Sequence, residues 1–386
     1  MELVLFFGSK STSVLRKKLY MMRPSRVLRG FFQSSPLSSL SSPSILLDGR
    51  HDDAEFLSSQ LHSKGFVPTT SQLLSLDATA MIKDRMNRLF HGQFDTGVYP
   101  DEWHWRAGIS KPNVTREICN SWKADTKIAS IVLDEKIGGF IASVMGWSSG
   151  ELAHFFSQAP HNITVFYNIM FCILSLAVRI AQDDLVWKVP STKQYTDDST
   201  VGFHQDSAYI SNQFVPYDNN SVTLWIALDD AHKCNGCLEY SVGSQKWRPL
   251  LHRMDDHSNT TTSTESSEIS DFHSSDSSSY RNGVSVAAQL AGVSQNIVEA
   301  VVVKEGFGVL HHQDVWHGSN ANKSPTRHRR ALVAHYIRGD VSFRQKGANY
   351  IYGRYKRHNS VELDETFFPI IYGKERSKWL DDFLTK

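Results

Sequence analysis

The sequence predicts an α+β protein with a β-sandwich or jelly-roll core. Apolar residues recur at helical spacing mainly within residues 48–147. After residue 178, the dominant segments are rich in β-branched residues or alternate between apolar and polar, and turn residues bound them. Helices followed by a run of antiparallel strands are typical of this fold class.

The expected elements follow this order along the chain. Helices are expected over residues 52–61, 76–90 and 125–145. Strands are expected over residues 222–228, 297–303, 308–311 and 331–337. Residues 346–386 are rich in aromatic side chains, so we expect them to pack against the core as a C-terminal cap.

Composition limits the classes of protein that need to be considered. The chain has 386 residues, of which 40% are apolar and 11% aromatic, as in an ordinary globular protein. The 41 basic and 40 acidic residues nearly cancel, so nothing indicates binding to nucleic acid or to a charged membrane surface. The apolar stretch 163–180 is interrupted by Tyr167, Asn168 and Arg179, and we expect no transmembrane span.

The cysteines indicate a reducing compartment, because four in a chain of this length do not make a disulfide framework. Cys234 and Cys237 enclose Asn235 and Gly236, and no second pair of ligands lies at zinc spacing. Asn-Gly between apolar segments is a strong two-residue turn signal, so a β-hairpin is expected there rather than a structural metal.

The first 47 residues differ from the rest of the chain. Glu2 is their only acidic residue, against seven lysines and arginines, and serines crowd residues 34–44. This composition predicts a transit peptide and a mitochondrial location. The alternatives are a peroxisomal signal, or a disordered basic tail on a cytoplasmic protein.

Residues 255–283 are rich in Ser, Thr and Asp and contain almost no apolar side chains. Such a composition cannot bury a core, so we expect a mobile surface loop. The loop separates the two halves of the chemical site that the sequence suggests.

That site begins with His204 and Asp206 and is completed by His317. Two imidazoles and one carboxylate can hold one face of a ferrous ion and leave the opposite positions open, as in non-haem iron oxygenases. Residues two apart on a strand share a face, and His317 is expected from a different strand. His312 and Asp314 form a second His-x-Asp pair. Their position just before Trp316-His317 favours the end of a strand, with His311 or His312 packing or touching solvent.

Three open positions on the iron suit 2-oxoglutarate, which takes two, and dioxygen, which takes one. The distal carboxylate of 2-oxoglutarate needs a fixed cation, and the planar fork of arginine binds a carboxylate through two parallel hydrogen bonds. Arg329 alternates with Ala331, Val333 and His335 and so shares a face with them, whereas Arg330 points to the other face. Ser319, two residues after His317, can add a hydroxyl group.

Ordered motifs in the chain resemble the phytanoyl-CoA dioxygenase family of iron(II)/2-oxoglutarate oxygenases over roughly residues 55–345. They are Leu-Val-Trp-Lys-Val-Pro at 185–190, Phe-His-Gln-Asp-Ser-Ala-Tyr at 203–209, Thr-Leu-Trp-Ile-Ala-Leu-Asp at 223–229, Asn-Gly-Cys-Leu-Glu-Tyr at 235–240, Gly-Ser at 243–244, and Trp-His-Gly-Ser-Asn at 316–320 with its continuation through Asn-Lys-Ser at 322–324 to Arg-Arg-Ala at 329–331.

The resemblance implies a double-stranded β-helix, the jelly-roll, cupin-like core, with N-terminal flanking helices. It implies hydroxylation of a second substrate coupled to the conversion of 2-oxoglutarate to succinate and CO2, with iron(II), 2-oxoglutarate and O2 required and ascorbate a candidate reductant. His204, Asp206 and His317 match the iron ligands and catalytic set. Four further residues match the cosubstrate side of the site: Lys188, Trp225, Ser319 and Arg329. The family suggests an apolar or acyl substrate, such as an acyl-CoA or a lipid.

The oxygenase domain is expected over residues 48–345, with one departure from the family. Residues 151–176 form an apolar block that is either an insertion or translated non-coding sequence. A catalytically inactive β-helix that binds a ligand or partner is the alternative function. A halogenase of the same fold would lack the carboxylate ligand, and Asp206 argues against it.

Overall fold

The computed structural model describes residues 44–47, 53–147, 177–191, 199–247, 280–345, 350–373 and 376–385. All of them belong to one compact unit that spans residues 42–386. The block 151–176 and most of the leader and of the 255–283 tract lie outside the described residues.

The described helices are α1 (Ala54–Lys64), α2 (Leu76–Phe90), α3 (Thr126–Val132), α4 (Glu135–Val144), α8 (Asn282–Leu290) and α9 (Trp379–Leu384). The described strands are β1 (Phe66–Pro68), β2 (Glu102–Trp103), β3 (Arg116–Cys119), β4 (Val178–Lys188), β5 (Val201–His204), β6 (Phe214–Val215), β7 (Ser221–Ala227), β8 (Leu238–Ser241), β9 (Val298–Val301), β10 (Gly308–His312), β11 (His317–Ser319), β12 (Arg329–Arg338), β13 (Ser342–Phe343) and β14 (Ile370–Tyr372).

Two antiparallel sheets form the core. The larger is eight-stranded in the order β1-β10-β7-β12-β4-β3-β2, with β14 paired to β4, and the smaller has the order β5-β11-β8-β9. From β4 to β12 the chain passes repeatedly from one sheet to the other, which makes a double-stranded β-helix and confirms the predicted α+β jelly-roll class.

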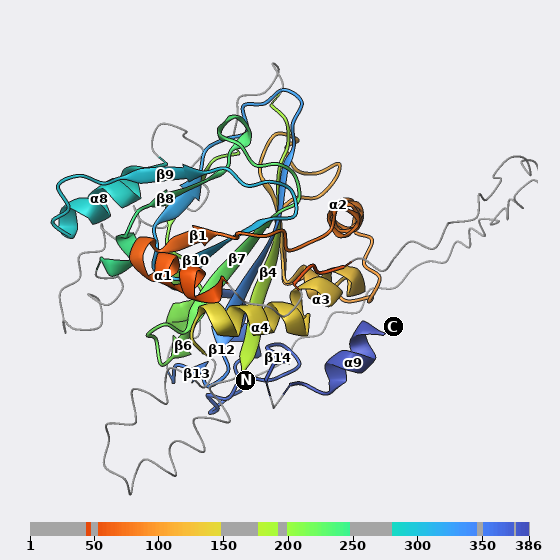
Figure 1. The fold of residues 1–386 in the computed structure, drawn as a ribbon. Coiled ribbons are helices and arrows are strands. Elements are labelled where there is room, and N and C mark those ends of the chain that lie inside the picture. The colour runs from red at the N-terminus through yellow and green to blue at the C-terminus, as the bar shows by residue number, and fades with distance from the viewer. Residues whose placement is uncertain are drawn as a thin grey trace, which may run out of the picture. The chain divides into compact units, whose positions relative to one another are not determined.

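The larger sheet is covered on both faces. On one face, helices α1 and α4 lie across it (Figure 1), and the core between them includes Leu61, Ile141, Leu224 and Leu332. The other face meets the smaller sheet through a second core that includes Trp225 and Tyr240. The cavity described below lies on this second face.

Polar side chains cap the starts of α2, α3 and α4. Ser75 accepts a hydrogen bond from the backbone N–H of Ala78 at 3.1 Å, and α2 then covers the predicted range 76–90. The single helix predicted over 125–145 is wrong, because Asp125 and Asp134 each cap a helix start and divide the segment into α3 and α4.

The part of the chain expected to be mainly helical also contains strands. β1, β2 and β3 are two to four residues long, too short to show a period in the sequence, and all join the larger sheet. Two predicted strands lie within one residue of their observed bounds at either end, β7 and β10. The strand predicted at 297–303 is shorter as β9, and β12 extends beyond the predicted 331–337.

Segments on either side of the expected oxygenase domain contribute to the core. Ile45 forms a β-bridge with Leu74, and Ile45 and Leu47 are buried, so a deletion through residue 47 would remove core side chains. Near the C-terminus, Ile351, Tyr352 and Phe368 pack with Phe214 in one buried cluster, in the position of the expected cap. Residues 280–283, within the tract expected as a loop, include the start of α8.

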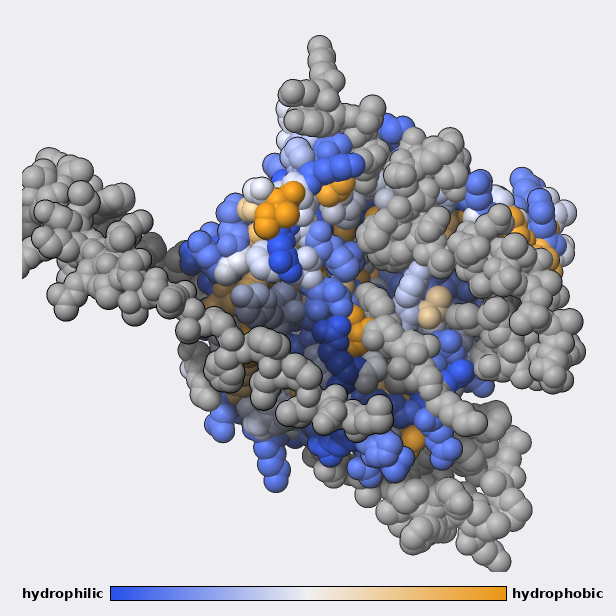
Figure 2. Space-filling view, turned by 180° about the vertical axis from the view of Figure 1, so that it is seen from behind, coloured by the Kyte–Doolittle hydropathy of each residue, from blue (hydrophilic) through white to orange (hydrophobic). Residues whose placement is uncertain are grey.

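The surface seen in Figure 2 is largely hydrophilic among the described residues, and hydrophobic ones occur in small separate groups. Within the same described ranges, no helix combines the length and hydropathy that crossing a bilayer requires.

Candidate active site

Two of the three candidate iron ligands lie on neighbouring strands of the smaller sheet, and the third follows one of these strands. His204 ends β5 and His317 begins β11, and the two residues are direct partners in the ladder. Asp206 was expected to continue the strand, but it starts a 3-10 turn instead. The backbone stays extended through Gln205, so both side chains still point to the same side.

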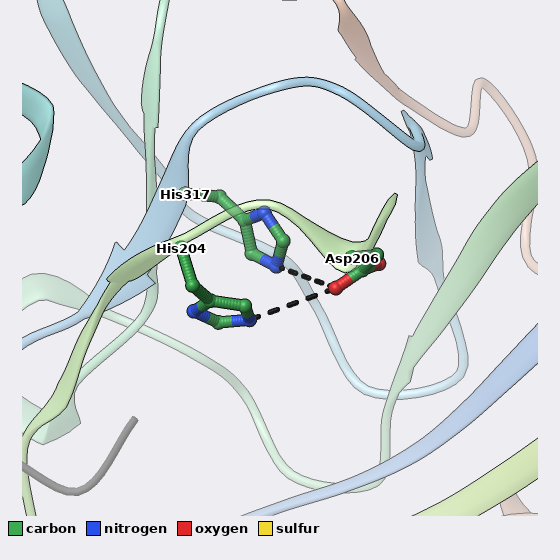
Figure 3. A group of neighbouring side chains, drawn as sticks. All are labelled: His204, Asp206 and His317. Carbon is green, nitrogen blue, oxygen red and sulfur yellow. Dashed lines mark ion pairs between the residues drawn. The ribbon is translucent and has the colours of Figure 1, made fainter. Parts of the chain in front are cut away.

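The donor atoms are placed for a single metal ion. Asp206 Oδ1 lies 3.6 Å from His204 Nε2 and 3.5 Å from His317 Nε2 (Figure 3). His204 Nδ1 lies 2.8 Å from the carbonyl of Gly202, and His317 Nδ1 lies 3.0 Å from that of Val315. A carbonyl can only accept, so each Nδ1 carries the proton and each Nε2 presents its lone pair to the centre of the triad.

The second oxygen of Asp206 is held by protein groups. Thr223 Oγ1 donates to Oδ2 at 2.5 Å, and His311 Nε2 contacts the same oxygen at 2.9 Å. His311 is itself fixed by the hydroxyl of Tyr240, 3.0 Å from its Nδ1. Burial opposes the charged carboxylate, but His317 and the surrounding hydrogen bonds hold the pKa of Asp206 well below its usual range. Asp206 is therefore an anion with Oδ1 directed at the metal position.

The donor set fits a ferrous ion. Two neutral imidazoles and one carboxylate oxygen, all buried, form the facial arrangement that non-haem iron oxygenases use. The competing pair does not contribute to it, because Asp314 accepts a hydrogen bond from Tyr217 and His312 Nδ1 accepts one from the backbone N–H of Asp314. Neither residue lines the cavity. The preference for His204 and Asp206 is confirmed, and His311 proves to pack inside the site.

A cavity of about 110 Å³ opens beside the triad. Its wall combines the iron-side residues with several residues that the sequence had singled out for the cosubstrate, namely Trp225, Ser319 and Arg329. Apolar side chains from both sheets complete much of the remaining surface, among them Val186, Leu238 and Val333.

Arg329 forms a cationic end of this cavity. Arg329 is 1% exposed, with Nε donating to the carbonyl of Gly236 at 3.0 Å and Nη2 to Ser319 Oγ at 3.1 Å. Its Nη1 has no hydrogen-bond partner in the described part of the chain. Burial lowers the pKa of Arg329 to about 10, still far above neutral pH. A buried cation with a donor to spare has the chemistry that a carboxylate ligand requires.

The hydroxyl of Ser319 lies beside the same guanidinium. Its Oγ accepts from Lys188 Nζ at 2.7 Å and from Arg329. Because both lone pairs of the hydroxyl are used, its hydrogen is directed to a third group.

Lys188 lies behind this end of the cavity rather than in its wall. The side chain is fully buried and also donates to the carbonyls of Ser319 and Asn320, at 3.1 and 2.7 Å. Lys188 therefore fixes the β11 end that carries Ser319, and contact with a ligand in the cavity would be indirect. Arg330 points to the other face, as predicted, and pairs with Asp229 at 2.7 Å.

The Asn235-Gly236 step has a role that the sequence did not reveal. The predicted hairpin is wrong, because β7 and β8 belong to different sheets and a 3-10 turn joins them. Gly236 has φ +81°, and a Cβ there would lie 2.4 Å from the carbonyl of Asn320. This close approach brings the Gly236 carbonyl to Arg329 and sets the direction of its guanidinium.

Most of the far wall of the cavity was not predicted from the sequence. Glu117, on the short strand β3, and Asp184 and Gln182, on β4, line the wall together with His335. Asp184 Oδ2 lies 3.0 Å from His335 Nε2. Only the predicted sharing of a face by Arg329, Val333 and His335 gave any indication that His335 would line the cavity.

Comparison with known proteins gives the family. The family model described as "Phytanoyl-CoA dioxygenase (PhyH)" matches residues 61–331. The chain belongs to this family. It is thus an iron(II)/2-oxoglutarate oxygenase, with His204, Asp206 and His317 as the facial triad.

Solved structures agree in fold. The alpha ketoglutarate dependent epimerase SnoN from nogalamycin biosynthesis matches with a TM-score of 0.52 at 14% identity, over 83% of this chain and 99% of that one. The carbocyclase SnoK from the same biosynthesis matches with a TM-score of 0.51 at 18% identity, over 82% and 97%. SnoN has also been solved in complex with Fe3+, alpha ketoglutarate and nogalamycin RO. No curated protein matches this chain in sequence.

Proposed function

We propose that this chain hydroxylates a small organic molecule and converts 2-oxoglutarate to succinate and CO2 in the same turnover. The observation that carries the proposal is the presence of the triad and of the Arg329–Ser319 anion site in one cavity. An inactive β-helix that only binds a partner would have no need of a buried triad and a buried cation facing the same space.

Each residue has a defined part in this reaction. When bound, iron supplies the activation of dioxygen and of the keto acid. The two imidazoles and Asp206 Oδ1 hold the ion on one face, and the groups at Asp206 Oδ2 keep that carboxylate from rotating. Arg329 and Ser319 bind the distal carboxylate of 2-oxoglutarate and so direct its keto acid end toward the triad. Trp225, whose ring centroid lies 5.6 Å from the guanidinium carbon of Arg329, excludes water from the same side.

The substrate is expected to bind on the part of the wall that 2-oxoglutarate leaves free. Apolar residues there, including Val201 and Ile210, support an aliphatic portion of a substrate, as the family suggests. Ascorbate remains a candidate for keeping the iron reduced.

The test is succinate formation by the purified chain with ferrous iron, 2-oxoglutarate and oxygen. We expect slow succinate release without substrate, faster release with a substrate, and none from His317→Ala. A chain that binds iron and 2-oxoglutarate but forms no succinate with any compound in a broad panel would support the inactive binding module instead.

We propose in addition that the basic leader directs the chain to mitochondria, on the evidence of its composition. A fluorescent protein fused after residue 43 should enter mitochondria. A chain that lacks the leader should begin at Ser44, so that it keeps the buried side chains of Ile45 and Leu47. Cytosolic or peroxisomal fluorescence would rule the mitochondrial reading out.

A further inference from the structure

The cavity has opposite charge character at its two ends. Arg329 and Ser319 lie at one end, and Glu117 and Asp184 lie on the wall formed by β3 and β4. One carboxylate oxygen of Glu117 and one of Asp184 lie within 4.8 Å of each other, and Cys119 Sγ lies within the same distance of both. If 2-oxoglutarate occupies the Arg329 end, the substrate must meet the acidic wall.

The acidic wall is held in place from behind. Gln182 Nε2 donates to both oxygens of Asp184 at 2.8 and 2.9 Å, and Gln182 Oε1 accepts from the hydroxyl of Tyr352 at 2.8 Å. His335 adds its contact to Asp184 from β12. Asp184 is therefore oriented by buried neighbours before any ligand enters, which reduces the ordering cost of binding.

The surroundings of Glu117 disfavour its charged form. Burial, and then repulsion by Asp184, raise the pKa of Glu117 to about 8. His335, which contacts Asp184 at 3.0 Å, opposes part of this rise, and a cation bound between the two carboxylates would lower the pKa of Glu117 further. An anionic group placed there would meet the same repulsion from Asp184.

We propose that the substrate is a small molecule with an aliphatic body and a protonated amino group, and that Glu117 and Asp184 bind the amino group. The proposal rests on the proposed function, since it assigns the substrate of that same cavity. An ammonium group has three donors, enough to reach both carboxylates, and its carbon chain would lie along Val186, Val201 and Ile210. A CoA thioester, whose phosphates are anionic, is disfavoured at this wall.

The test uses three probes of matched shape and different charge: butylammonium, 1-butanol and butyrate. Binding to the full chain loaded with ferrous iron and 2-oxoglutarate is measured by calorimetry without oxygen, so that no turnover occurs. We expect butylammonium to bind at least about tenfold more tightly than either other probe, the factor that one charge-assisted hydrogen bond provides. Equal or tighter binding of butanol or butyrate would overturn the proposal.

Variants locate the effect. Glu117→Gln and Asp184→Asn keep the side-chain shape and should each weaken butylammonium binding at least about tenfold, while 2-oxoglutarate affinity stays within about twofold of wild type. Glu299→Gln removes an exposed carboxylate on β9 and serves as the control, with no change expected. Should one isosteric variant fail to fold, the other variant and the wild-type probe series still decide the matter.

Two results separate this inference from the proposed function. Failure of the wild-type chain to bind iron or 2-oxoglutarate would refute the proposed function itself. Normal loading without preference for the amine would refute only the substrate assignment. A third result would also refute the assignment: the wild-type chain retains a second metal ion, and Cys119→Ser releases it. Glu117 and Asp184 would then be metal ligands.

Discussion

Replacing Arg329 by alanine should remove most of the affinity for 2-oxoglutarate. The residue is 1% exposed, and its guanidinium is fixed by Gly236 and Ser319 and keeps Nη1 free of partners in the described chain. Two hydrogen bonds to a charged group are worth about 1.5–3 kcal/mol each, and water entering the space left by the side chain recovers part of this. We therefore expect a loss of about 2–5 kcal/mol of binding free energy, which corresponds to a dissociation constant roughly 30- to 5,000-fold larger.

The assay is calorimetric titration of 2-oxoglutarate into iron-loaded protein in the absence of oxygen. Arg330→Ala is the matched control, because the neighbouring residue of the same strand points away from the cavity and pairs with Asp229. Its dissociation constant should stay within about twofold of wild type. Equal losses for the two variants, or an unchanged constant for Arg329→Ala with normal iron content, would refute the assigned orientation of β12.

Three further predictions follow from the same geometry. His311→Ala should weaken iron binding by about 10- to 100-fold, because Asp206 loses a partner at Oδ2, whereas His312→Ala should leave iron content unchanged; metal analysis after dialysis checks this, and equal effects would contradict it. Gly236→Ala should weaken 2-oxoglutarate binding more than iron binding, since its Cβ would displace the Asn320 carbonyl and disturb the contact to Arg329; a larger effect on iron would count against the role given to this turn. The pKa of Glu117 is about 8 in the folded chain and about 4.5 in the unfolded chain, so between these pH values Glu117 releases a proton on unfolding. The free energy of unfolding should therefore fall as the pH rises from 5 to 8, by at most about 1.4 kcal/mol per pH unit from this group. Glu117→Gln should flatten that slope in denaturant titrations, and an unchanged slope would show that Glu117 does not titrate as described.

The parts of the site that the sequence revealed are those with a regular spacing. His204 and Asp206 stand two apart, and the alternation from Arg329 to His335 places one face of β12 toward the cavity. Both patterns follow from the two-residue period of extended chain and need no knowledge of distant contacts.

The residues that the sequence did not reveal are placed by contacts between distant segments. Glu117 lies on a strand of four residues, and only its pairing with β4 brings it to the cavity. His311 follows other apolar strand residues and gave no sign that it would reach Asp206 across the space between the sheets. Lys188 was matched by motif alone, and the ladder places it beside Arg329 but behind Ser319.

The most direct test of the iron centre compares the two His-x-Asp pairs in one measurement. Iron content is determined for the purified wild-type chain, for Asp206→Ala and for Asp314→Ala after identical loading and dialysis. Asp206 Oδ1 faces both histidine Nε2 atoms, whereas Asp314 lies outside the cavity, so the wild-type chain and Asp314→Ala should retain iron and Asp206→Ala should lose it. Retention of iron by Asp206→Ala together with its loss from Asp314→Ala would contradict the assignment of the metal centre.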